Sequence, residues 1–291
     1  MGRSPARSRV KASLITTVHN EARHLEGFLE SIASQSVLPE EVVITDGGST
    51  DGTVKIIRDF MARNGHLNMK LLCAGKRTNI AAGRNMAIRA SSCDVIAVTD
   101  AGCILEENWL YEITAPLFDG GPADTVGGWY GAVIENGFHK KTAQAVLPLL
   151  KDIDPEAFLP SSRSIAFRRS CWEQAGGYPE GLTMWAEDTL FDLRLKRTGC
   201  RFTFNPKAKV HWRMRDNQRE ALRQFYHYGY GDGEAGLFTA RYLARMALLL
   251  FPPLLALTKK GFSFWGLRYQ LYAAQVLGWT RGRLKKRKKF L

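Results

Sequence analysis

Acidic side chains stand in this sequence where an apolar run ends or a helical pattern begins. Asp46 follows the apolar run 42–44, Asp100 follows the apolar run 95–98, and glycine comes within two residues of each acid. Glu187 and Asp188 lie together shortly after a Gly-Gly-Tyr-Pro turn. A carboxylate can take a proton from a hydroxyl group, and glycine lets a ligand approach the backbone closely. These residues therefore indicate an acid-lined crevice that binds a polar ligand.

Each of these residues also has a purely structural explanation. Asp is a common turn residue, so Asp100 could cap the turn that follows it. The helix dipole favours acids in a first turn, so Glu187 and Asp188 could simply begin a helix. His211 stands beside apolar residues, where a lone histidine is usually structural. Both explanations stay open for each residue at this level.

The first hundred residues alternate between strand and helix patterns, and this alternation positions the acids. Helices are expected at 25–32, with Asn20 as N-cap, at 54–61 and at 79–90, and Pro39 is expected to break the chain. Strands are expected at 12–18, 42–44, 71–72 and 94–99. This order predicts an α/β fold with parallel strands, whose carboxyl-terminal loops share one crevice.

The later part of the chain is more mixed. Extended segments are expected at 126–134, 161–167, 202–204 and 210–212, and helices at 138–150 and from Glu187 onward. In that last helix, Leu190, Leu193 and Leu195 are expected to pack inward. Neither G-x-G-x-x-G nor G-x-x-x-x-G-K-[ST] occurs, which disfavours dinucleotide oxidoreductases and P-loop ATPases.

Positive charge is concentrated at the two ends of the chain. The 291 residues carry a formal net charge of +13, and eleven of these charges lie in residues 1–11 and 281–291, which contain no acid. Five scattered cysteines show no metal-ligand spacing, so free thiols in a reducing compartment are expected. No signal peptide and no nucleic-acid-binding module is recognisable, so nucleic acid is not an expected partner.

Five motifs, in order, resemble those of family-2 glycosyltransferases. They are H-N-E at 19–21, T-D-G-G-S-T-D-G-T at 45–53, A-G-R-N at 82–85, V-T-D-A-G-C at 98–103 and W-A-E-D-T-L-F-D-L-R-L at 185–195. The resemblance covers residues 12–235 and implies a GT-A-type α/β domain, a mostly parallel central sheet flanked by helices. Outside it lie a basic N-terminal arm (1–11), a hydrophobic helical extension (236–280) and a polybasic tail (281–291).

The resemblance implies that several residues bind a nucleotide-sugar donor. Thr17, His19 and Glu21 fall where the family holds the nucleoside, and His19 occupies a position that is usually tyrosine. Asp46 matches the acid that contacts the base, and Gly48 belongs to the same loop.

Further residues match the part of the family's site where the chemistry occurs. Arg84 matches an arginine near the nucleotide, and Asp100 with Ala101 matches the start of the D-x-D motif near ribose and diphosphate. Asp188, next to Glu187, matches the general base that deprotonates the acceptor hydroxyl. Because the Q-x-x-R-W motif of processive synthases is absent, the resemblance implies inverting transfer of a single sugar.

Two glycines depart from the family pattern. Gly47 replaces a second acid in the loop after residue 46, and Gly102 replaces the last acid of D-x-D, the family's most direct metal ligand. A divalent cation, Mn²⁺ or Mg²⁺, is still expected, held by Asp100 and His211 with diphosphate oxygens and water. The alternative is that Lys76, Arg77 or Arg84 neutralises the diphosphate without a metal.

The C-terminal extension is apolar and aromatic but contains no clean membrane span. Residues 246–257 are too few and contain two prolines, whereas residues 262–279 carry Arg268 and Gln275 on a stripe opposite Leu271 and Val276. This pattern resembles a helix lying in a membrane interface, where the polybasic tail adds attraction to anionic lipid. A soluble helical cap and a hairpin of two short spans remain alternatives.

The expected protein is therefore a glycosyltransferase on the cytoplasmic side of a membrane, peripheral or shallowly inserted. Its expected acceptor is a membrane lipid or lipid-linked saccharide. Two other functions fit the same sequence. A nucleotidyltransferase using the same sheet would release pyrophosphate rather than a nucleoside diphosphate. An inactive nucleotide-sugar sensor or membrane-docking protein is permitted by Gly102, although the intact Glu187-Asp188 pair argues against it.

Overall fold

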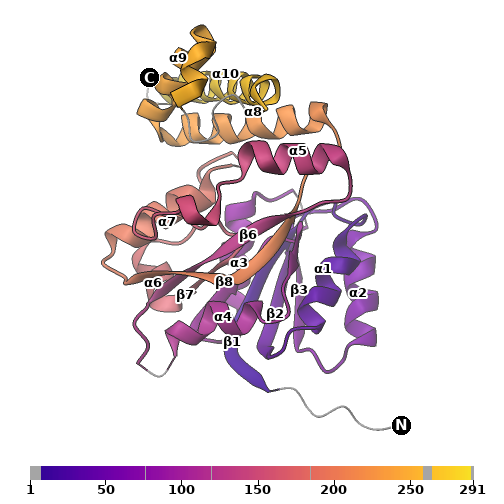
Figure 1. Ribbon diagram of the computed structural model, residues 1–291. Coiled ribbons are helices and arrows are strands. Elements are labelled where there is room, and N and C mark those ends of the chain that lie inside the picture. The colour runs from indigo at the N-terminus through magenta and orange to yellow at the C-terminus, as the bar shows by residue number, and fades with distance from the viewer. Residues whose placement is uncertain (1–7, 76, 119, 184, 258–263, 290–291) are drawn as a thin grey trace. The chain divides into compact units, whose positions relative to one another are not determined.

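The computed structural model describes residues 8–75, 77–118, 120–183, 185–257 and 264–289, which form two compact units (Figure 1). Unit 1 comprises Met1–Gly131, Leu150–Glu180 and Asp188–Trp212, and unit 2 comprises Ala132–Leu149, Gly181–Glu187 and Arg213–Leu291. Residues 1–7 of the basic arm, Lys76 and the last two residues of the tail lie outside the described residues.

An eight-stranded sheet forms the centre of unit 1, in the order β3-β2-β1-β4-β7-β6-β8-β5. Its strands are β1 (Arg9–Val18), β2 (Leu38–Asp46), β3 (Met69–Cys73), β4 (Val95–Val98), β5 (Cys103–Leu105), β6 (Thr125–Val133), β7 (Ile165–Arg168) and β8 (Phe202–Arg213). The first four strands pair in parallel, as expected, whereas β4 with β7, β7 with β6, and β5 with β8 are antiparallel. The antiparallel return brings the segment before β7 to the carboxyl end of β4.

Helices flank this sheet, as expected for a GT-A-type fold. They are α1 (Leu25–Ala33), α2 (Thr53–Arg63), α3 (Ile80–Ala90), α4 (Trp109–Thr114), α6 (Arg169–Gln174) and α7 (Glu187–Arg197), with the 3-10 helices η1 (Ala115–Leu117) and η2 (Leu150–Asp152). Helix α3 lies especially close to β1, because a Cβ added at Gly83 would be 2.9 Å from Thr17 Cγ2. The Asn79 side chain accepts a hydrogen bond from the Ala82 N–H and so caps this helix.

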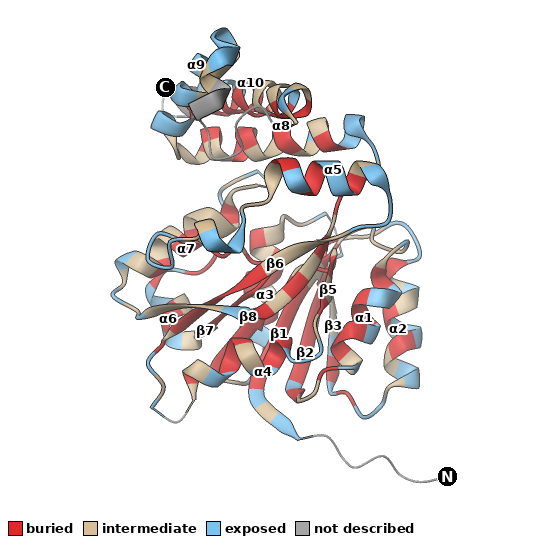
Figure 2. Cartoon of the chain, in the orientation of Figure 1, coloured by how far each residue is buried: buried red, intermediate tan, exposed pale blue. Residues whose placement is uncertain are grey.

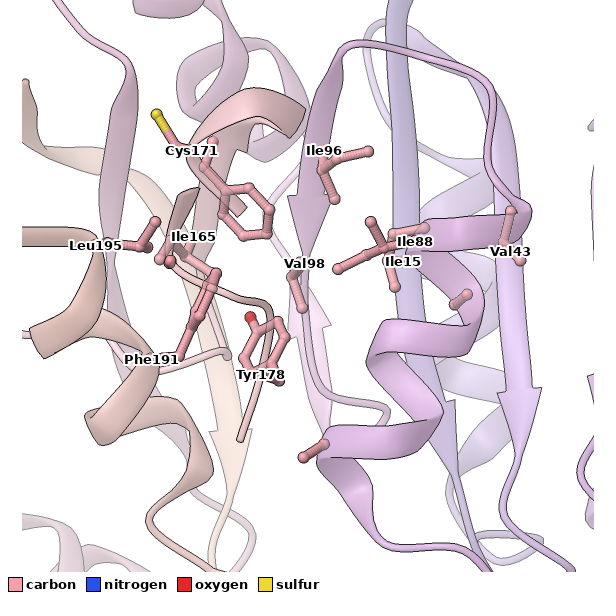
Figure 3. Packing of buried hydrophobic residues seen from close by; sticks show 14 residues of the cluster. Ile15, Val43, Ile88, Ile96, Val98, Ile165, Cys171, Tyr178, Phe191 and Leu195 are labelled. Atoms are coloured by element: carbon pink, nitrogen blue, oxygen red, sulfur yellow. The ribbon is translucent and has the colours of Figure 1, made fainter. Parts of the chain in front are cut away.

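One part of the core lies between the sheet and the helices α3, α6 and α7. The central strands are buried along their length (Figure 2). In the cluster of Figure 3, Ile15 and Val98 from the sheet share a core with Tyr178, Phe191 and other residues. The rings of Tyr178 and Phe191 stack with centroids 4.0 Å apart. Of the apolar residues expected to pack inward from α7, Leu195 is fully buried, whereas Leu190 and Leu193 are half-buried.

Several elements differ from their sequence-based expectation. Pro39 does not break the chain but is the second residue of β2. It pairs with β1 beside a register irregularity, a position where a proline, which has no N–H, is tolerated. Asn20 does not cap α1, because the N-cap of that helix is His24. The Asn20 side chain instead accepts a hydrogen bond from the Thr50 N–H. Residues 161–164 are a loop rather than a strand, and the two short strands expected at 202–212 form the single strand β8.

The expectation of five free thiols is wrong for two of the cysteines. Cys171 of α6 and Cys200, which follows α7, form a disulfide across 29 residues of sequence. Cys73, Cys93 and Cys103 are free. Nothing in the spacing of the five cysteines indicated this pair, because the packing of α6 against α7 brings the two side chains together.

Unit 2 is helical. It contains α5 (Gly137–Val146), α8 (Gln218–Ala235), α9 (Thr239–Leu250), the 3-10 helix η3 (Pro252–Leu257) and α10 (Trp265–Lys289). Helices α8 and α10 lie backbone to backbone, because a Cβ at Gly229 would be 2.0 Å from the Gln275 carbonyl oxygen and a Cβ at Gly278 would be 2.0 Å from that of Tyr226. Only glycine permits such an approach at these positions.

The orientation expected for residues 262–279 is wrong. Arg268 and Gln275, expected on a water-facing stripe, are 2% and 8% exposed, because α10 packs against α8. The polybasic stretch continues α10 to Lys289, and Lys285 Nζ lies 3.1 Å from Glu234 Oε1 of α8. Within the described part of the chain, no helix combines the length and the hydropathy needed to cross a membrane.

Candidate active site

The loops after β1 and β2 are hydrogen-bonded to each other. The Asn20 N–H donates to Ser49 Oγ at 2.8 Å, and the Glu21 N–H donates to Thr53 Oγ1 at 2.9 Å. Thr17, His19 and Glu21 are half-buried at the end of β1 and in the loop after it. The three residues expected to hold a nucleoside therefore lie at the carboxyl edge of the sheet, beside the glycine-rich loop.

Asp46 shapes this glycine-rich loop. Its side chain is 3% exposed and accepts hydrogen bonds of 3.1 Å from the N–H groups of Gly48 and Ser49. Gly48 has φ of +85°, a left-handed conformation that favours glycine. Asp46 thus fixes the backbone at the edge where the base was expected to bind.

Arg84 and Asp100 are directly paired. Arg84 Nη2 lies 2.7 Å from Asp100 Oδ1; the arginine side chain is 3% exposed and the aspartate 33%. The guanidinium also lies over the ring of Tyr178, 5.2 Å from its centroid. Asn85, the next residue, holds the Gly-Gly-Tyr-Pro turn, because its Oδ1 accepts from the Tyr178 N–H and its Nδ2 donates to the Tyr178 carbonyl. The A-G-R-N segment therefore connects the end of β4 to that turn.

Helix α7 begins with the two acids of the E-D motif. Glu187 is 6% exposed, whereas Asp188 is half-buried and accepts a 2.7 Å bond from the Thr189 N–H. The segment just before them is held within unit 2. There Trp185 stacks on His227 of α8, and both the N–H and the hydroxyl of Thr183 donate to Glu234.

Asp192 is a further acid on α7, one turn after Asp188. It is fully buried, and its Oδ2 accepts a 3.3 Å bond from the Ser161 N–H. Burial and the negative charge of Asp188 raise the pKa of Asp192 well above its usual value. Burial thus favours the neutral form of Asp192.

Tyr178 interacts both with Arg84 of α3 and with the aspartates of α7. Burial raises the pKa of its hydroxyl, the positive charge of Arg84 opposes this shift, and the charges of Asp192 and Asp188 reinforce it. The hydroxyls of Tyr178 and Ser162 are hydrogen-bonded at 2.9 Å. Arg84 of α3 and the two aspartates of α7 thus act electrostatically on one side chain.

Arg163 is a site residue that sequence reasoning missed. Arg163 lies two residues before Ile165, which pairs with Val98 at the end of β4. Burial and the charge of Asp100 raise the pKa of the Cys103 thiol, whereas Arg163 lowers it. An arginine two residues before an apolar strand was visible in the sequence, but the pairing of that strand with β4 was not.

The two residues expected to hold a metal ion each contact another side chain. His211 Nε2 lies 2.9 Å from Glu106 Oε1, which also contacts Lys209 Nζ at 2.8 Å, whereas Asp100 contacts Arg84. Burial opposes ionisation of Glu106, but the bonds from Lys209 and His211 outweigh it and lower the pKa of Glu106.

The position of Gly102 supplies no ligand in place of the missing acid. A Cβ at Gly102 would have open space around it. No other group that the structure describes therefore occupies the place of the missing carboxylate. Among the described residues there is no group of three or more His, Cys, Asp and Glu side chains that could hold a metal ion. The side chains present therefore do not fit a protein-chelated divalent cation.

Comparison with known proteins identifies relatives of this chain. The sequence profile of glycosyl transferase family 2 matches residues 13–175. Glycosyltransferase AglE of Haloferax volcanii is 32% identical over 127 residues, which are 43% of this chain and 41% of AglE. N-acetylglucosaminyl-diphospho-decaprenol L-rhamnosyltransferase of Mycobacterium tuberculosis is 24% identical over 241 residues, 68% of this chain and 74% of that enzyme. The chain thus spans less than half the length of AglE.

A solved structure has the same fold. The mannosyltransferase PcManGT from Pyrobaculum calidifontis, in complex with GDP-Man and Mn²⁺, superposes with a TM-score of 0.64 at 20% identity. The match covers 94% of this chain and 89% of PcManGT. The likeness establishes the GT-A-type fold expected from the motifs.

Proposed function

The chain belongs to glycosyl transferase family 2, and on this premise we propose that it moves one sugar from a nucleotide-sugar donor to a hydroxyl acceptor. The observation that carries the proposal is that Arg84, which is paired with Asp100, and Asp188 both act electrostatically on Tyr178. Asp100 lies after β4, at the carboxyl edge of the sheet, where α/β sheets bind ligands.

In the proposed reaction, Asp188 is the general base. The acceptor oxygen attacks the anomeric carbon while its proton passes to the Asp188 carboxylate. The bond between that carbon and the donor phosphate breaks, and the departing nucleoside diphosphate keeps the electron pair. One displacement by one nucleophile inverts the anomeric centre. Asp188 suits this role better than Glu187, because Glu187 is nearly fully buried.

The donor nucleoside is proposed to lie between the loops after β1 and β2. Thr17, His19 and Glu21 would contact it from one loop, and the backbone around Gly48, fixed by Asp46, from the other. Ala101, 5% exposed, follows Asp100 at the end of β4 and would line the ribose side. Unlike Asp46, whose oxygens accept backbone bonds, His19 has a ring that can stack on a base.

The proposed acceptor is a membrane lipid or a lipid-linked saccharide. Residues 235–291 contain twelve basic residues and no acidic residue, which suits an anionic lipid surface. The Mycobacterium tuberculosis relative is named for a decaprenol-linked acceptor. Peripheral association through unit 2 would hold the enzyme near such a substrate.

Helix α9 carries a row of exposed apolar side chains. Leu243, Met246 and Leu250 are 56%, 36% and 83% exposed, and Phe251 after the helix is 65% exposed. Their spacing of three, four and one residues puts the first three on one helix face. Arg241 and Arg245 flank this ridge, so we propose α9 as the membrane-contacting element.

The test of the proposed function is a ligand panel followed by product analysis. Full-length protein is heated with UDP-, GDP- and dTDP-linked sugars, with and without Mn²⁺, because a ligand that binds only the folded state raises Tm. The stabilising donor is then supplied with a polyprenyl diphosphate-linked saccharide. Release of the nucleoside diphosphate with extension of the acceptor is expected. Release of pyrophosphate would identify a nucleotidyltransferase, and no response to any donor would contradict the proposal.

A further inference from the structure

Arg163 is held between two aromatic rings at the carboxyl edge of the sheet. Its guanidinium carbon lies 4.3 Å from the ring centroid of Trp212 on β8 and 5.1 Å from that of Tyr130 on β6. Its Nη1 donates to Ser161 Oγ at 3.1 Å. A guanidinium held by aromatic faces keeps its charge and loses little further freedom when it binds an anion.

The loop that carries Arg163 is fixed on several sides. The Ser161 N–H donates to Asp192, Ser162 is bonded to Tyr178, and Ser164 Oγ accepts from Trp109 Nε1 at 2.8 Å and donates to the Ala208 carbonyl at 2.9 Å. Ser161 has φ of +63°, a conformation that a non-glycine residue keeps only where its surroundings impose it. The loop therefore presents Arg163 in one position.

Two acids of the candidate site lie near this guanidinium. Arg163 lies two residues before Ile165, which pairs with Val98 of β4, and the charges of Arg163 and Asp100 both act on Cys103. Burial raises the pKa of Tyr130, Arg163 lowers it, and Asp188 raises it, so Arg163 and Asp188 both lie close to that hydroxyl. Arg163 thus shares one electrostatic target, Cys103, with Asp100 and another, Tyr130, with Asp188.

A cation is needed at this place. The leaving nucleoside diphosphate gains negative charge as the glycosidic bond breaks, and fixed positive charges can stabilise it. The described side chains offer no metal-chelating group of three or more His, Cys, Asp and Glu, and Arg84, although close to Asp100, is almost fully buried. We propose that Arg163 binds the diphosphate of the nucleotide-sugar donor and supplies the charge that a chelated divalent ion would otherwise supply. This inference rests on the proposed transferase function.

Binding measurements on full-length protein test the proposal. The wild type, Arg163→Gln and Arg163→Lys are titrated calorimetrically with UDP, GDP and dTDP and with the matching nucleosides, in EDTA and in Mn²⁺. The nucleoside diphosphate that binds the wild type should bind Arg163→Gln about 10- to 100-fold more weakly, because a charge-assisted contact to phosphate is lost. Nucleoside affinity should not change, and EDTA should weaken wild-type diphosphate binding less than about threefold. Arg163→Lys should be intermediate, because it keeps the charge without the planar fork.

Arg168→Gln is the matched control. Arg168 is the last residue of β7, the strand that follows the Arg163 loop, and it pairs with Asp124. This variant should therefore bind nucleotides like the wild type. If Arg163→Gln fails to fold, Arg163→Lys and the EDTA titration still decide.

Four results would overturn the inference. Equal diphosphate affinity of Arg163→Gln and wild type would do so, and so would wild-type binding that disappears in EDTA. A rise in acceptor KM alone would assign Arg163 to the acceptor instead. If the wild type binds no nucleotide and no nucleoside, the proposed function fails and this inference fails with it.

Discussion

Asp192 Oδ2 accepts a 3.3 Å hydrogen bond from the backbone N–H of Ser161, which joins the helix of the proposed base to the loop of Arg163. Asp192 is fully buried, and burial and the charge of Asp188 raise its pKa. Asp192 thus ties α7 to the loop that carries Arg163, whereas Asp188, one turn earlier on the same helix, is the proposed base.

The raised pKa of Asp192 predicts a pH-dependent stability. Between the unfolded value, about 3.9, and the raised folded value, the native state binds more protons than the unfolded chain, so the free energy of unfolding falls as pH rises. Asp192→Asn cannot ionise and should remove this slope, which is at most about 1.4 kcal/mol per pH unit. Urea unfolding at a series of pH values measures it. The exposed Asp59→Asn is the control, and an unchanged slope in Asp192→Asn would contradict the prediction.

Asp188→Asn should abolish transfer while leaving donor binding intact. The substitution keeps the shape of the side chain and removes only the proton acceptor, so kcat should fall by about 100-fold or more. Donor affinity is measured separately by calorimetry. Asp154→Asn, at an exposed residue, is the control. If Asp188→Asn turns over within about tenfold of the wild type, Asp188 is not the general base.

The Arg84–Asp100 pair should contribute to stability as well as to the site. Asp100→Asn removes the carboxylate that neutralises an almost fully buried guanidinium and should lower the free energy of unfolding by about 1–3 kcal/mol, reduced from the fully buried case because Asp100 is partly exposed. The exposed pair Arg63–Glu26 is the control, and Glu26→Gln should cost less than about 1 kcal/mol. Equal losses in urea unfolding for the two variants would refute this difference.

The parallel half of the fold could be predicted because it is local. Each strand and helix from β1 to β4 is a short segment with its own hydrophobic period, and the acids at strand ends follow from that order. Asp46 and Asp100 were therefore placed at strand ends, whereas Arg84 was named from the resemblance of its A-G-R-N segment. Arg163 was not, because its proximity to Asp100 depends on an antiparallel return from more than sixty residues away.

The burial of Arg268 and Gln275 illustrates a different limit. A helical wheel shows which residues share a face but not what that face contacts, and α10 presents this face to α8. The glycines of the two helices carried a signal, since Gly229 and Gly233 on α8 and Gly278 and Gly282 on α10 recur every four residues, the spacing that allows backbones to meet. The glycine spacing thus indicated that α10 packs closely against α8, whereas a helix lying in a membrane interface was expected there.

The Cys171–Cys200 disulfide should stabilise the sheet and α7 region. In the loop-entropy view, a cross-link closing 29 residues contributes about 3–4 kcal/mol. Cys200→Ser and a reducing agent should each lower Tm, and the reducing agent should have no further effect on Cys200→Ser. Alkylation of the unfolded, unreduced protein should label three cysteines, matching the three that are free. Cys73→Ser, at an exposed free thiol, is the control, and five labelled cysteines would contradict the disulfide.

Membrane association should depend on the exposed ridge of α9. The Leu243→Ser/Leu250→Ser double variant removes two exposed apolar side chains and should weaken binding to vesicles by about 10- to 100-fold, because each buried leucine contributes on the order of 1.5 kcal/mol. The matched control is Leu277→Ser/Leu284→Ser on α10, whose side chains are 66% and 56% exposed. Full-length proteins are co-sedimented with vesicles of increasing anionic lipid content, at low and high salt, and binding should increase with anionic lipid and decrease with salt.

A truncation at residue 281 is a poorer test, because it would remove the turn of α10 that carries Lys285 and its contact with Glu234. If the α10 variant loses more binding than the α9 variant, the wrong helix has been assigned. If the wild type stays in the supernatant at every composition, unit 2 does not contact membranes.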